Sequence, residues 1–256
     1  MTPTALQQPH GGRQRDVSRS GPSARRHAVA QAVQLVVAGV VLLVVMAALG
    51  LVLTHVLDHG ALVHADTRIS DGLFRHRSTA WNNVTWWATQ FGEALTVIVI
   101  AAGVAVALAL RTRRLLPSAF VVAALIGESS IYFLITLVVH RHRPLIKHLD
   151  AAPPTSSFPS GHTAASLCLY GALAILAWRL SRRRPLRIVA TAVAVVVPIA
   201  VAFARVYRGM HYPSDVVSGA ILGALWLTVV VRVLGSDLGP APVAPPSHHD
   251  GAERAR

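Results

Sequence analysis

The sequence predicts an all-α integral membrane protein: six transmembrane helices in a bundle, with an amphipathic interfacial helix between the first two. Three observations lead to this prediction. The chain is 53% hydrophobic with a mean hydropathy of +0.51, which is more apolar than an ordinary soluble domain. Long apolar segments recur along it, and its basic residues gather in short clusters between those segments, as membrane topology requires.

Six apolar segments are close to the length that a spanning helix needs, about 20 residues for a hydrocarbon core about 30 Å thick. They cover residues 29–57, 94–110, 116–139, 164–180, 186–206 and 216–234. The first segment is too long for the apolar part of a secretory signal. It is therefore interpreted as a spanning helix.

The stretch between the first two spans, residues 58–93, is mixed in character. Its charges nearly cancel, and it contains Trp81, Trp86 and Trp87. Tryptophan favours the boundary between lipid and water, so this stretch is predicted to form the interfacial helix. A surface loop with buried aromatic residues fits equally well.

The two ends of the chain lack apolar periodicity. Residues 1–27 are rich in Gly, Ser, Gln and Arg, and residues 236–256 are rich in Pro and Ala, so both are predicted to be disordered tails. The membrane domain then covers residues 28–235. The single cysteine, Cys168, excludes an intramolecular disulfide.

Charge placement predicts the topology. The loops at 111–114 and 182–184 are strongly basic and mark the cytoplasmic side of the plasma membrane. Both tails are then cytoplasmic, and the loops at 58–93, 140–163 and 207–215 face outward. A net charge of +13 divided among such clusters indicates a lipid bilayer as partner and argues against nucleic acid.

The stretch Phe-Pro-Ser-Gly-His-Thr at residues 158–163 precedes an apolar run and is typical of a helix start. Ser160 is a plausible N-cap, and Gly161 lets a ligand approach the backbone closely. The free N–H groups of a helix start favour an anion. His162 adds a titratable ring there, suited to a general acid.

His211 and Asp215 are four residues apart at another helix start, with Pro213 between them. A carboxylate that accepts the Nδ1–H of a histidine leaves Nε2 free as a base or nucleophile. We therefore expect Asp215 to orient His211. For an isolated pair of this spacing, a purely structural bond is about as common.

Arginines complete the candidate site. Guanidinium groups bind phosphate bidentately and stay charged, which makes Arg143 and Arg205 candidate phosphate ligands. Arg141 is a further candidate, whereas Arg208 is interpreted as a lipid-headgroup contact, the default for an arginine at a membrane edge. No metal cage is visible in the sequence, and we expect neither a metal nor another cofactor.

The motifs Arg-x-Arg-Pro (141–144), Pro-Ser-Gly-His (159–162) and Arg-x5-His-x3-Asp (205–215) occur in this order on the last four spans. Together they resemble the type-2 phosphatidic acid phosphatase family, which includes lipid phosphate phosphatases and undecaprenyl-diphosphate phosphatases. The resemblance implies a phosphohistidine on His211, oriented by Asp215, with His162 as the acid. It also implies that phosphate is held by Arg143, Arg205, Ser160 and Gly161.

By this resemblance the expected function is hydrolysis of a lipid phosphate or diphosphate at the outer membrane face. Undecaprenyl diphosphate, phosphatidic acid and phosphatidylglycerol phosphate all remain open as substrates. Transfer of the phosphoryl group to a lipid or sugar acceptor, or non-catalytic binding or transport of a lipid phosphate, are the alternatives.

Two positions depart from the family pattern. Thr136 stands where a lysine is usual, and Ala204 where a serine is usual. A replacement cation would have to come from Arg141 or Lys147. Glu128 is an acid at membrane depth, where such residues are functional by default; here it is expected to pair with an arginine.

Overall fold

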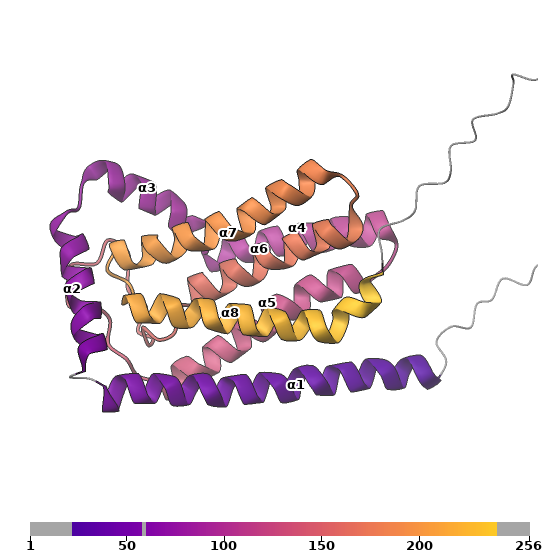
Figure 1. Cartoon of the computed structure of the whole chain (residues 1–256), viewed down its shortest axis with the longest axis horizontal. Helices are drawn as coiled ribbons and strands as arrows, with labels where there is room; N and C mark the ends of the chain where they lie inside the picture. Colours follow the sequence, from indigo (N-terminus) through magenta and orange to yellow (C-terminus); the bar gives the residue numbers. More distant parts are fainter. Residues whose placement is uncertain (1–21, 58–59, 240–256) are drawn as a thin grey trace, which may run out of the picture.

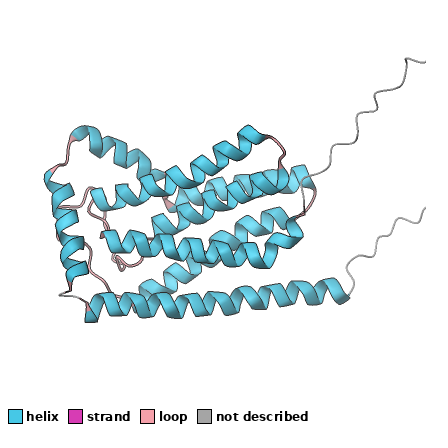
Figure 2. Cartoon of the chain, in the orientation of Figure 1, coloured by secondary structure: helices cyan, strands magenta, loops and turns pink. Residues whose placement is uncertain are grey.

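The computed structural model describes residues 22–57 and 60–239, and within them every regular element is helical (Figure 2). The long helices are α1 (Pro22–Leu51, continued by a π-helical stretch at Val52–Val56), α4 (Ala94–Thr112), α5 (Leu116–Val138), α6 (Gly161–Leu180), α7 (Arg184–Tyr207) and α8 (Pro213–Leu234). They run along the long axis of the molecule (Figure 1). All six are long and apolar enough to span a membrane, which confirms the predicted number of spans.

The last three helices of the bundle begin two or three residues earlier than their apolar runs, whereas α4 and α5 begin with theirs. α6 begins at Gly161 and α8 at Pro213, whereas their apolar runs begin at residues 164 and 216. Polar and small residues in a first turn continue the helical backbone without contributing to hydropathy. This difference matters because it places His162 in the first turn of α6 and Asp215 in the first turn of α8.

The expected tails also differ from the structure at their inner edges. α1 already includes residues 22–27, and Gly235–Leu238 form a 3₁₀ turn in which the Leu238 side chain is fully buried. Apart from Gly239, the other residues of both predicted tails lie outside the described part of the chain.

The interfacial segment forms two helices where a single one is predicted, α2 (Ala61–Arg75) and α3 (Thr79–Gln90). The chain breaks between them because Ser78 caps α3 by accepting a bond from the Trp81 N–H (3.3 Å). Arg77 fixes the break by donating to the carbonyls of Tyr207 (3.0 Å) and Lys147 (2.5 Å). α2 lies across one end of the bundle (Figure 1).

α6 is the central helix. Half of its most apolar window is buried, more than in any other candidate span among the described residues, and it packs against α5, α7 and α8. The outward surface of the bundle is apolar, with valines of α1 such as Val36 and Val44 more than 60% exposed. Such a surface is costly in water and suits lipid.

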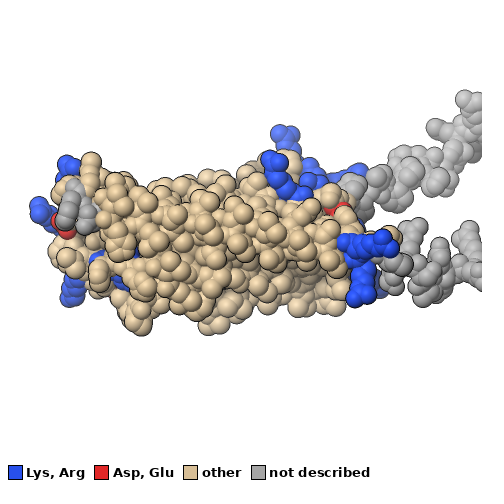
Figure 3. Space-filling model, turned by 90° about the horizontal axis from the view of Figure 1, so that it is seen from below, with Lys and Arg blue, Asp and Glu red and all other residues tan. Residues whose placement is uncertain are grey.

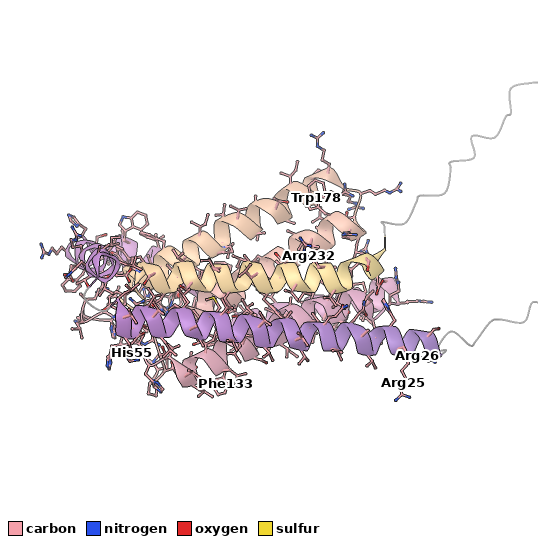
Figure 4. All side chains as sticks on the ribbon, turned by 60° about the horizontal axis from the view of Figure 1, so that its bottom comes forward. Arg25, Arg26, His55, Phe133, Trp178 and Arg232 are labelled. Atoms are coloured by element: carbon pink, nitrogen blue, oxygen red, sulfur yellow. The ribbon has the colours of Figure 1, made fainter. Side chains whose placement is uncertain are left out.

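Charged side chains lie at the two ends of the molecule and leave the middle of the visible surface uncharged (Figure 3). Arg25 and Arg26 mark one end of α1, and His55 marks the other (Figure 4). This division into two charged ends and an apolar belt is the pattern of a bilayer-spanning protein.

Candidate active site

Three segments that are far apart in the sequence meet at the end of the bundle that α2 crosses. The Ser160 N–H, at the start of α6, donates to the Asp215 carbonyl of α8 (3.0 Å). Arg143, from the loop after α5, donates through Nη1 to the Met210 carbonyl (2.7 Å). The structure therefore brings the three motifs together at this end of the bundle.

The His211 side chain is 4% exposed and oriented by the backbone. Its Nδ1 lies 2.7 Å from the Ser157 carbonyl oxygen. A carbonyl only accepts, so Nδ1 carries the hydrogen and Nε2 keeps its lone pair. The predicted partner, Asp215, is 3.9 Å from Nδ1, too far for a hydrogen bond. Nδ1 thus carries the hydrogen, as expected, but its acceptor is the Ser157 carbonyl and not Asp215.

The surroundings of His211 keep its ring neutral. Burial lowers its pKa well below the ordinary value, and the positive charges of Arg205 and Arg143 lower it further. A neutral imidazole with a free Nε2 is the form that attacks phosphorus. Positive charge from two arginines beside such a nitrogen favours the approach of an anion.

The Asp215 carboxylate accepts hydrogen bonds from the start of α8 and from Arg141. Its Oδ2 accepts the Tyr212 N–H (2.9 Å), which forms part of a capping box at the start of α8. Its Oδ1 lies 2.5 Å from Arg141 Nη1. The sequence predicts that Arg141 contacts substrate, but its other terminal nitrogen, Nη2, donates to Asp66 (2.9 Å), so two carboxylates occupy the guanidinium.

Arg143 and Arg205 each keep an N–H group without a hydrogen-bond partner among the described residues. Arg143 donates through Nη2 to Thr155 Oγ1 (3.4 Å), and Arg205 donates through Nη1 to Thr89 Oγ1 (3.1 Å). The Nε atoms of both are buried without a partner among the described residues. Because a buried unpaired N–H is costly, a bound oxyanion would satisfy both.

Asp150 already neutralises part of this positive charge. Its carboxylate accepts from Arg205 Nη1 (3.3 Å) and from Arg208 Nη2 (2.5 Å). Arg208, interpreted from the sequence as a headgroup contact, is only 4% exposed and pairs inside the protein.

His162 is paired with an acid that the sequence did not single out. Its Nε2 lies 2.9 Å from Glu93 Oε2. Glu93 is the N-cap residue of α4, yet its side chain does not cap that helix. The hydrogen bond to His162 lowers the pKa of Glu93. A carboxylate in this position stabilises the protonated form of a histidine, which is the form a general acid needs.

Ser160 and Gly161 form the start of α6 as predicted, without the expected capping bond. Ser160 is fully buried, its side chain makes no cap bond, and its Oγ accepts from Thr163 Oγ1 (3.0 Å). Gly161 packs against the Tyr132 ring, since a Cβ there would lie 2.8 Å from a ring carbon. The glycine is therefore needed for close packing.

Two cavities meet at His162. A polar one of about 440 Å³ is lined by Glu93, Asp150, Arg205 and their neighbours. An apolar groove of about 490 Å³ runs between α4 and α5 and includes Gly161 and Tyr132. Its wall includes Glu128, which accepts a bond from Ser129 (3.2 Å) and has no arginine partner among the described residues, contrary to expectation.

A profile of the PAP2 superfamily matches residues 94–237, more than half of the chain. The chain belongs to the PAP2 superfamily. Its motif residues from Arg141 to Asp215 all lie in the matched region, whereas α1, α2 and α3 precede it.

Two relatives put this PAP2 protein in context. It is 31% identical over 121 residues to an undecaprenyl-diphosphatase from Sulfolobus acidocaldarius, covering 46% of this chain and 54% of the relative. The chain thus spans about half the length of that curated relative. A crystal structure of a transmembrane PAP2-type phosphatidylglycerolphosphate phosphatase from Bacillus subtilis superposes with a TM-score of 0.64 at 22% identity. It covers 78% of this chain and 94% of that one, which supports the fold.

The structure places no cation where Thr136 replaces the usual PAP2 lysine. Thr136 is 7% exposed and donates to the Phe133 carbonyl (2.7 Å) within α5. Arg141 is bound by carboxylates and Lys147 is exposed. Among the described residues near His211, the positive charge comes from Arg143 and Arg205.

The sequence did not indicate four residues that form hydrogen bonds with site residues from distant parts of the chain. Each lies outside the three motifs, and its partner is at least 50 residues away: Glu93, Asp150, Asp66 and Ser157. An acid just before an apolar helix is an ordinary N-cap signal, so nothing local distinguishes Glu93.

Proposed function

We propose that this PAP2 protein hydrolyses a lipid phosphate or diphosphate through a phosphohistidine on His211. The observation that carries the proposal is the free Nε2 of a neutral, buried His211 beside two arginines with unpartnered buried N–H groups. Positive charge fixed around a phosphoryl group is the main catalytic device in phosphoryl transfer.

In the first step Nε2 of His211 forms a bond to phosphorus as the bond from phosphorus to the leaving oxygen breaks. The His162 imidazolium gives its proton to that oxygen. In the second step a water oxygen forms a bond to phosphorus as the bond from phosphorus to His211 Nε2 breaks, His162 takes up a proton from the water, and inorganic phosphate leaves. Arg143 and Arg205 balance the charge of the non-bridging oxygens, so the mechanism that we propose needs no metal.

The apolar groove supports a lipid substrate. It shares His162 with the polar cavity, so a substrate whose phosphate lies near His211 can extend its chain along α4 and α5. A lipid in this position keeps its tail among apolar side chains and brings only its headgroup to the arginines. The named activities of both relatives concern lipids with phosphate groups, which supports the same class.

We place the site on the outer face of the plasma membrane, with both termini in the cytoplasm. The basic loop residues 111–114 and 182–184 support this orientation through the positive-inside rule. The exposed Trp86 and Trp87 of α3 suit the interface at the opposite end.

Phosphate release from lipid mono- and diphosphates in detergent tests the proposal. We expect turnover that survives EDTA, is inhibited by vanadate and is lost in His211→Ala, and a phosphohistidine that is trapped from radiolabelled substrate by acid quench. Turnover abolished by EDTA and restored by a divalent ion would contradict the metal-free mechanism.

The same assay separates the alternatives. Product that forms only when a lipid or sugar acceptor is added would indicate a phosphotransferase. Headgroup binding without phosphate release by the wild-type protein would indicate a binder or transporter.

A further inference from the structure

A buried carboxylate on α2 lies behind the catalytic loop. Asp66 is 1% exposed and accepts bonds from Arg141 Nη2 (2.9 Å) and from the backbone N–H of Ser214 (2.9 Å). It also accepts a short bond from Ser214 Oγ. The Asp66 carboxylate thus accepts hydrogen bonds both from Arg141 and from the first turn of α8.

Arg141 connects Asp66 to the neighbourhood of the nucleophile. Its Nη1 bonds Asp215 (2.5 Å) and Ser214 Oγ (2.7 Å), and Asp215 in turn holds the Tyr212 N–H. Burial alone would lower the pKa of Arg141, but Asp215 and Asp66 outweigh it and raise the pKa. One guanidinium between two carboxylates leaves the cluster with a net charge of about −1.

We propose that Asp66 is a positioning residue for the nucleophile. Through Arg141 and Ser214, Asp66 fixes the turn that carries His211, and its negative charge contributes to the electrostatic potential at that histidine. This inference rests on the proposed function. It assigns a catalytic contribution to α2, which precedes the region matched by the PAP2 profile.

The charge of Asp66 gives a signature that a purely structural contact lacks. Asp66→Asn keeps the size of the side chain but removes one negative charge from the network that joins Asp66, Arg141 and Asp215. The site then becomes more positive, which strengthens phosphate binding and weakens the electron-donating power of the imidazole. Loss of packing alone would not strengthen binding.

Steady-state kinetics on the full-length protein tests this, with orthovanadate as the phosphate analogue. We expect Asp66→Asn to lower kcat by about tenfold or more, as is typical for loss of a supporting partner, while KM and the vanadate inhibition constant both fall. Asp66→Glu should restore part of kcat. Asp71→Asn is the matched control, because Asp71 lies on the same helix, is half-buried and is outside the network, and it should behave as wild type.

The outcomes separate the two proposals. Wild-type protein without activity would overturn the proposed function itself. Two results in an active wild-type background would overturn only the role of Asp66. One is that Asp66→Asn has the same kinetics as Asp71→Asn. The other is that Asp66→Asn has a lower melting temperature and binds vanadate more weakly than the wild type. If Asp66→Asn does not fold, Ser214→Ala decides: it removes two hydroxyl bonds without changing charge and should lower kcat at constant KM, whereas unchanged kcat would overturn the inference.

Discussion

The pairing of His162 with Glu93 concerns the leaving-group side of the site. The bond of 2.9 Å gives the proposed general acid a carboxylate partner, just as the Ser157 carbonyl gives His211 an acceptor. The two histidines thus have different partners. Glu93 gives His162 a charged hydrogen-bond partner, whereas burial and a neutral partner favour imidazole at His211.

Replacing Glu93 by Gln should therefore impair proton donation more than binding. We expect kcat for a lipid phosphate to fall about 10- to 100-fold, less than the roughly 10²–10⁴-fold that general acid catalysis contributes, because His162 itself remains; KM should change little. An aryl phosphate needs no proton on its leaving group, so its kcat should change far less. Equal losses on both substrates, measured by phosphate release, would contradict this role.

The pKa of His211 determines how kcat/KM should depend on pH at the acid end. Its pKa is lowered well below the ordinary value, which is about 6.5, so the ring stays unprotonated as the pH falls through that value. After correction for the ionisation of the substrate, kcat/KM should not decline near pH 6.5, and its acid limb should lie lower. A limb at pH 6.5 or above that is assigned to His211 by histidine NMR would contradict the lowered pKa.

At the scale of elements, close contact between α6 and α8 holds the motifs together. Gly223 of α8 faces the backbone of α6, where a Cβ would lie 2.8 Å from the Ala164 carbonyl oxygen. Gly219, one turn earlier, faces the Ser160 carbonyl in the same way. Since Ser160 and Ala164 flank His162, the glycines of α8 fix the distance between the His162 and His211 segments.

Gly223→Ala should consequently force the two helices apart. We expect a loss of about 1–3 kcal/mol of stability, typical of overpacking, together with reduced activity. Gly103→Ala is the matched control, because a Cβ at Gly103 meets nothing within 4 Å. Alanine in a helix interior is favoured over glycine by about 0.5–1 kcal/mol, so thermal unfolding in detergent should show opposite shifts.

At the scale of the whole molecule, the site loops and the basic loop at 182–184 lie at opposite ends of the bundle. Leu145, in the site loop, is 98% exposed, and Arg182 is exposed at the other end. In a Cys168→Ala background, we expect a membrane-impermeant maleimide added to intact cells to label Leu145→Cys and to leave Arg182→Cys unlabelled until lysis. The reverse pattern would place the site in the cytoplasm.

The sequence by itself determined the number of spans and the residue types of the site. Hydropathy depends only on local composition over about 20 residues, so six apolar runs could be counted without a structure. Likewise, two histidines and two arginines in spaced motifs indicate phosphate chemistry from side-chain properties alone.

Only the tertiary structure decided which group bonds to which. The Ser157 carbonyl replaces Asp215 at His211, Arg141 joins Asp66 to Asp215, and Glu93 reaches His162 from 69 residues away. Backbone carbonyls are present in every residue and carry no sequence signal, and a carboxylate shows no trace of its distant partner. Helix packing brings these groups within hydrogen-bond distance, and no local pattern records that packing.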